Sequence, residues 1–170
     1  MEKTKKLSIC AVLISLALVL SYIERFFPLQ MIVPLPGIKL GLANIVTLVA
    51  LYYLDWKSTY GIILVRCLLG AIFSGSVSGL IFSLTGGLFS VSIMLLVKKI
   101  SCFSIYGVSI LGAAAHNMGQ IMAAIVLMQS IYIGSYLPYL LIVALFTGYA
   151  MGSVTAGVLK VILRTGGTFD

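Results

Sequence analysis

The sequence predicts an all-α membrane protein with six transmembrane helices. Of its 170 residues, 61% are hydrophobic and only 9% are charged, whereas a soluble domain is usually about 25% charged. The apolar residues form segments of roughly the 20 residues that cross a hydrocarbon core, and short stretches with charges, glycine or proline separate them. We therefore expect residues 1–170 to form one integral membrane domain.

The first span is predicted over residues 7–23. Its basic start is similar to a secretory signal, but no small-x-small cleavage site follows, so we expect it to be retained. Residues 24–37 are apolar but contain Pro28, Pro34 and Pro36, which favours an interfacial, re-entrant or capping loop over a span. The other five spans are predicted over residues 38–54, 59–74, 80–97, 105–129 and 139–163.

The positive charges predict cytoplasmic termini. Six spans return the chain to the side on which it starts, and with that side inside, eight of the eleven Lys and Arg residues are cytoplasmic, as the positive-inside rule expects. These eight are Lys3, Lys5, Lys6, Lys57, Lys98, Lys99, Lys160 and Arg164. A five-span alternative would put Lys98 and Lys99 outside. No basic block interleaved with aromatic residues accompanies the net charge of +7, so we expect no nucleic acid partner.

Small residues recur at helical spacing. Ala11 and Ser15 lie four residues apart in the first span, and the last span carries a longer row at the same spacing. Such rows let membrane helices approach closely. Packing within the monomer and docking of another membrane protein both remain open for the last span, whose row is Ala144, Gly148, Gly152 and Ala156.

The candidate binding residues are polar side chains inside apolar spans. A charge at the bilayer centre costs roughly 2.5–3.5 kcal/mol on insertion scales, so such residues face a partner or a wet cavity. By their distance from the span ends, they converge in the outer half of the bundle, where Arg66 would pair with a carboxylate or phosphate and the others would supply hydrogen bonds. The set is Lys39, Asn44, Arg66, His116, Asn117 and Gln120.

Each of these residues has a structural alternative. Arg66 could snorkel or bind a backbone carbonyl, and His116 could join two helices by a hydrogen bond. Asn44 could cap or bridge helices, and Lys39 could be an interfacial anchor. Glu24 and Arg25 are interpreted as loop charges, which could pair with each other or with Lys39. An aromatic wall for a ligand is available from residues that include Tyr22, Phe26, Phe27, Phe73 and Phe82.

No catalytic motif appears in the chain. There is no GxxxxGK[ST] loop for ATP, no HExxH and no GxSxG. The cysteines, Cys10, Cys67 and Cys102, have no metal-site spacing and are expected to be buried small hydrophobic residues. We therefore expect no enzyme activity, no metal and no cofactor, and any active transport would take its energy from a partner or an ion gradient.

Three segments carry a resemblance to a known family: PLPGIKLGLANIVTLVALYYLDW, FSGSVSGLIFSLTGGLFSVSIMLLVKK and LGAAAHNMGQIMAA. With them, nearly the whole chain resembles the bacterial Gx transporter family, also labelled heptaprenyl diphosphate synthase component I. This family is similar in layout to the substrate-binding S components of energy-coupling factor (ECF) transporters. The chain has no DD pair of the kind that prenyl synthases use in DDxxD motifs to hold magnesium and diphosphate, so we expect no role in chain elongation.

The resemblance implies a six-helix S-component bundle in the bacterial cytoplasmic membrane. It implies a substrate pocket in the outer half, covered by the loop over 24–37, for a vitamin, a cofactor or another small polar or anionic molecule. Docking on a transmembrane coupling subunit, which works with two ATPase subunits, would use the AxxxA-like pair Ala11 and Ser15. The alternative is a non-catalytic membrane accessory subunit linked to polyprenyl, quinone or redox metabolism.

Overall fold

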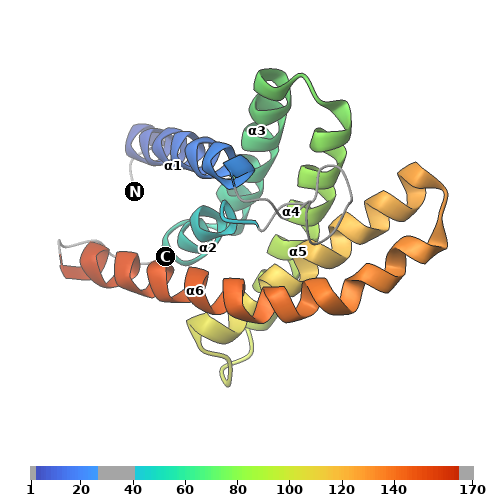
Figure 1. The fold of residues 1–170 in the computed structure, drawn as a ribbon. Helices are drawn as coiled ribbons and strands as arrows, with labels where there is room; N and C mark the ends of the chain where they lie inside the picture. Colours follow the sequence, from blue (N-terminus) through green and yellow to red (C-terminus); the bar gives the residue numbers. More distant parts are fainter. Residues whose placement is uncertain (1–2, 27–40, 165–170) are drawn as a thin grey trace.

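Six α-helices make up most of the described part of the chain, which is residues 3–26 and 41–164 of the computed structural model (Figure 1). The helices are α1 (Lys3–Ile23), α2 (Asn44–Tyr53), α3 (Trp56–Ser74), α4 (Val77–Lys98), α5 (Ile105–Met128) and α6 (Leu137–Arg164). Two short 3-10 segments are η1 (Glu24–Phe26) and η3 (Ile131–Tyr136). These ranges contain no strand.

All the helices except α2 are long and apolar enough to cross a membrane. The predicted first, third, fourth, fifth and sixth helices are confirmed, with boundaries that differ by a few residues. By the length and composition of these five helices, the chain is a multi-pass membrane protein. In Figure 1 the α3–α4 hairpin rises to the top of the view, while the α5–α6 hairpin extends to the right.

The length of the second predicted helix is wrong. The helix α2 starts at Asn44 and has 10 residues, about 15 Å at 1.5 Å per residue, which is half of the ~30 Å hydrocarbon core. Residues 41–43 form a turn instead, and Gly41 has a φ of +81°, a left-handed conformation that glycine adopts at no steric cost. Residues 38–40 lie outside the described residues, as does the part of the predicted loop over 27–37.

Local capping fixes where the other helices begin and end. The side chains of Asp55, Ser76 and Ser104 accept hydrogen bonds from backbone N–H groups in the first turns of α3, α4 and α5. Such caps satisfy donors that have no partner within the helix. Gly75 ends α3 in the left-handed conformation, with φ of +62°. The turn of the α3–α4 hairpin is therefore determined by the local sequence Ser-Gly-Ser at residues 74–76.

Glycines let α4, α5 and α6 pack backbone to backbone. A Cβ on Gly119 of α5 would lie 2.8 Å from the carbonyl oxygen of Thr85 in α4. A Cβ on Gly148 of α6 would lie 2.6 Å from Cα of Ile110 in α5, and Gly152 packs on the same helix. The small-residue row of the last span therefore serves packing within the chain, as the structural alternative predicted.

Four helix ends lie close together and are joined by polar contacts: the start of α1, the end of α2, the start of α3 and the end of α4. Lys6 forms an ion pair with Asp55, and Lys98 Nζ donates a 2.7 Å hydrogen bond to the carbonyl oxygen of Leu51. The Lys6 ammonium lowers the pKa of Asp55 to about 2. We call this region, which also includes Lys57, the lysine-rich end.

Candidate binding cavity

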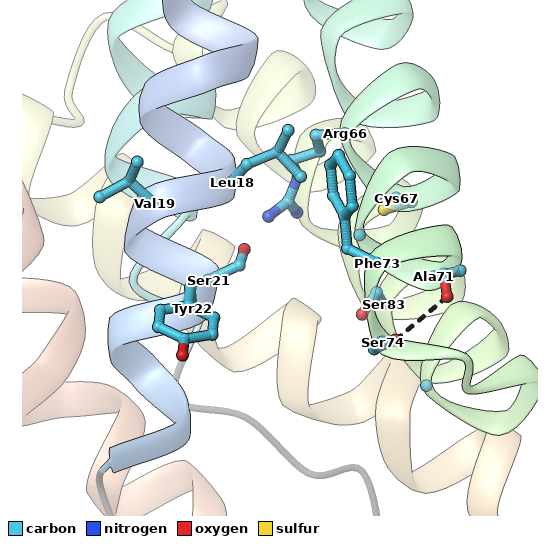
Figure 2. Close-up of a pocket in the computed structure, with 12 residues that line it drawn as sticks. Leu18, Val19, Ser21, Tyr22, Arg66, Cys67, Ala71, Phe73, Ser74 and Ser83 are labelled. Carbon is cyan, nitrogen blue, oxygen red and sulfur yellow. Dashed lines mark hydrogen bonds between the residues drawn. The ribbon is translucent and has the colours of Figure 1, made fainter.

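A cavity lies between α1, α3 and α4, in the halves of these helices that are remote from the lysine-rich end. It has a volume of about 390 Å³, within the range of small-molecule sites. Figure 2 shows side chains from all three helices around one space. The lining residues are Leu18, Val19, Ser21, Tyr22, Arg66, Cys67, Gly70, Ala71, Phe73, Ser74, Gly79 and Ser83.

Arg66 is the candidate residue that reaches this cavity. Its side chain is only 7% exposed, and Figure 2 shows its guanidinium pointing into the space between α1 and α3. Within the described residues it makes no hydrogen bond or ion pair, and its Nε is buried without a partner. The helix α3 continues for eight residues from Arg66 to Ser74, so the charge lies about 12 Å from that end of the helix.

A second group of polar side chains lies on α2 and α5. A Cβ on Gly41 would lie 2.9 Å from Nδ2 of Asn44 and 3.3 Å from Cδ2 of His116. A Cβ on Gly86 of α4 would lie 2.9 Å from Cε1 of His116 and 3.0 Å from Cγ of Gln120. The structure thus brings three of the predicted residues together around two glycines, and we call Asn44, His116 and Gln120 the polar cluster.

The polar cluster and the cavity meet at consecutive glycines of α4. Gly86 lies against His116 and Gln120, while a Cβ on the next residue, Gly87, would lie 3.4 Å from Nη2 of Arg66. The amide of Asn44 is 2% exposed, and neither its nitrogen nor its oxygen has a partner among the described residues. Because an unpaired buried polar group costs free energy, both Asn44 and Arg66 are suited to receive polar atoms from a ligand or from water.

Glu24 joins the cavity wall to the start of α2. It follows the last turn of α1, is only 5% exposed, and its carboxylate accepts a hydrogen bond from the N–H of Gly41. Glu24 thus lies between two helices, as expected of a loop charge, but it is buried and not solvated. Its burial ties the residues that wall the cavity on α1 to the glycine that lies against Asn44 and His116.

Asn117 belongs neither to the cavity wall nor to the polar cluster. Asn117 is on the α6 side of α5, where its Nδ2 donates a 2.8 Å hydrogen bond to the carbonyl oxygen of Leu140. It joins two helices, which is a common use of asparagine in membranes. Lys39 lies outside the described residues. Of the aromatic candidates, Tyr22 and Phe73 line the cavity, whereas Phe82 is in the core.

Ala11 and Ser15, the pair predicted for docking, lie together on the exposed face of α1. The hydroxyl of Ser15 donates a 3.0 Å hydrogen bond to the carbonyl oxygen of Ala11, so the face presents small side chains without a free polar group. Leu7 and Val12 are also exposed there. This face is open to lipid or to a partner.

The helix α1 contributes more to the cavity than sequence reasoning predicted, which named only Tyr22 from this helix. Its lining residues, such as Leu18 and Ser21, look like any other residues of an apolar span. The adjacent glycines Gly86 and Gly87 of α4 were an available signal for the site itself. Two consecutive glycines weaken a helix, so their presence indicates a place that other groups approach closely. Among the described residues, no group of three or more His, Cys, Asp or Glu side chains could hold a metal ion.

The comparisons with known proteins give one match. A family model described as heptaprenyl diphosphate synthase component I matches residues 13–158, from the third turn of α1 to within the last helix, so it includes both Arg66 and the polar cluster. No curated protein and no solved structure shows significant similarity to the chain. The chain belongs to the heptaprenyl diphosphate synthase component I family, as its sequence motifs predicted.

Proposed function

We propose that this protein is the substrate-binding subunit of an ECF-type importer, which captures a small polar or anionic molecule in the cavity between α1, α3 and α4. The observation that carries the proposal is Arg66: a cation that is buried in a membrane helix, lines a cavity of about 390 Å³ and makes no ion pair among the described residues. Intramembrane ionisable residues are costly and mark substrate or ion pathways.

The distribution of charge supports one orientation of the cavity in the membrane. The cavity lies in the halves of its helices that are remote from the lysine-rich end. Because lysines favour the cytoplasmic side, the cavity would open from the outer half, where an importer meets its substrate. In this orientation α2 is a half-helix in the inner half, and its first residue, Asn44, lies near mid-depth. Half-helix N-termini near the midplane favour anionic substrate groups in other transporters.

The energy for import would come from partners. The sequence has no P-loop, so a transmembrane coupling subunit with two ATPase subunits would drive the cycle. The exposed small residues Ala11 and Ser15 on α1 provide a surface on which the coupling subunit could pack closely. In this role the protein itself performs no chemical reaction, and its location would be the bacterial cytoplasmic membrane.

The second candidate is a non-catalytic membrane accessory subunit of a prenyl diphosphate synthase. The description of the family as component I of such a synthase favours it, because the name implies another component. The accessory role would give the exposed faces of the helices a partner, but it offers no reason for Arg66 to line a cavity.

Co-purification separates the two candidates. The tagged chain would be extracted in mild detergent from the cells that make it, and its partners identified by mass spectrometry. The importer proposal expects a coupling subunit and ATPase subunits, and their loss from an Ala11→Trp variant but not from Val161→Trp, which changes a lipid-exposed residue of α6. A soluble prenyl synthase subunit in place of the ATPases would overturn it in favour of the accessory role.

A further inference from the structure

The charge on the cavity wall is unbalanced. Of the described residues that line the cavity, only Arg66 is charged, and none is an aspartate or glutamate. A buried charge is stable only when it is paired or hydrogen-bonded. A ligand that completes this site therefore carries one negative group, and a guanidinium accepts a carboxylate or phosphate in a bidentate arrangement.

The rest of the cavity is suited to an apolar body. Leu18 of α1 points toward Phe73 of α3 across the opening, and Tyr22 lies further along α1 (Figure 2); Val19 also lines the cavity. Phe73 and Tyr22 are 77% and 62% exposed, so the site offers apolar surface that a ligand would cover. The anionic end would lie at Arg66, about 12 Å from the end of α3, and the apolar part would extend from there along these side chains.

The volume indicates how much of a ligand the cavity would cover. At ~30 Å³ for each water-sized group, a cavity of about 390 Å³ holds about thirteen such groups. The five non-hydrogen atoms of a phosphate head take about five of these groups, which leaves room for about eight carbon atoms. A heptaprenyl chain is far longer than this.

We propose that the ligand of this cavity is a short amphipathic anion, a carboxylate or phosphate monoester whose head pairs with Arg66 and whose tail of up to about eight carbons covers Leu18, Val19 and Phe73. The inference rests on the proposed binding function and narrows its ligand class. The same chemistry occurs in water-soluble metabolites and in small amphiphiles that partition into the bilayer.

The test is a homologous series of alkyl phosphates, from ethyl to decyl, with inorganic phosphate and the matched alkanols, on the full chain in lipid nanodiscs. Wild type would be compared with Arg66→Gln and with Arg164→Gln, a matched change at the exposed last residue of α6. Each methylene should tighten Kd about threefold to fourfold, the fold-change that ~0.8 kcal/mol per buried CH₂ gives, until about eight carbons. Arg66→Gln should remove the preference for phosphates over alkanols, and Arg164→Gln should keep it.

The outcomes separate this inference from the proposed function. Arg66-dependent phosphate binding whose Kd does not change with chain length would overturn the amphipathic class and leave a soluble anion as the substrate. Alkanols that bind as well as phosphates, or binding that Arg66→Gln does not alter, would overturn the inference itself. Phe73→Ser, which changes an exposed side chain, should reduce the chain-length effect; an unreduced effect would contradict the assigned wall.

The source of the ligand is read from the rate of binding with and without a bilayer. Wild type that binds octyl phosphate as fast in amphipol as in nanodiscs indicates uptake from water, and slower binding in amphipol indicates uptake from the membrane. Both results support the class of ligand, provided that the Arg66 dependence holds.

Discussion

The contact between α4 and α5 gives a sharp stability prediction for Gly119→Ala. The added Cβ would lie 2.8 Å from the carbonyl oxygen of Thr85 and 3.0 Å from Cα of Gly86. Both are backbone atoms, so no side chain can turn away and the two helices must separate. Overpacking of this kind costs about 1–3 kcal/mol, and it is opposed by the gain of up to ~1 kcal/mol that alanine brings to a helix.

Gly157→Ala is the matched control, because a Cβ there meets nothing within 4 Å. The helix-propensity gain is common to both variants and cancels, so the difference between them should be the steric cost of about 1–3 kcal/mol. For a chain of this size, 1 kcal/mol shifts Tm by about 2–4 °C. Thermal unfolding followed by circular dichroism in one detergent measures the difference. A Gly119→Ala variant that unfolds at or above the temperature of Gly157→Ala would refute the packing argument.

Three further predictions concern the lysine-rich end, the α5–α6 contact and the docking face. Asp55→Asn keeps an N-cap but loses the Lys6 pair, which at its partly exposed position is worth at most about 1 kcal/mol. Because the folded-state pKa of Asp55 is lowered to about 2, the pair stabilises above about pH 4 and is lost as pH falls toward about 2. The Tm difference from wild type should shrink over that range, and a constant difference would exclude the pair. Asn117→Ala should cost about 0.6 kcal/mol, the mean for interhelical hydrogen bonds in membranes, and leave ligand affinity unchanged in a binding titration; a loss of affinity would return Asn117 to the site. Ala11→Trp should block coupling-subunit capture in a pull-down and leave ligand binding intact, and normal capture would remove α1 as the docking face.

Hydropathy predicted most of the helices but not the length of α2. Residues 38–54 are apolar throughout apart from Lys39, Asn44 and Thr47, so a sliding average sees one span. The break at Gly41 depends on a φ of +81° and on the Glu24 carboxylate that binds its N–H. Glycine allows that conformation, but glycines are common in this chain, and the partner is 17 residues away. A local pattern could not identify it.

The candidate site was predicted in part for a physical reason. The cost of burying polar groups in lipid singles out Arg66, Asn44, His116 and Gln120, and the structure buries all four. The same cost does not say which neighbour satisfies a polar group. Asn117 therefore appeared equivalent to His116 beside it, although its amide is bound to Leu140 in α6. The apolar cavity wall on α1 carries no such cost, so only the aromatic Tyr22 was singled out there.

Native mass spectrometry tests the central claim, that Arg66 holds an anionic ligand in this cavity. Wild type and Arg66→Gln would be purified gently in parallel from the cells that make the protein, with thermal unfolding to show that both are folded. The account predicts a small molecule retained by wild type, negatively charged when released, and absent from Arg66→Gln. Identical spectra from two folded proteins, with or without a bound molecule, would contradict it.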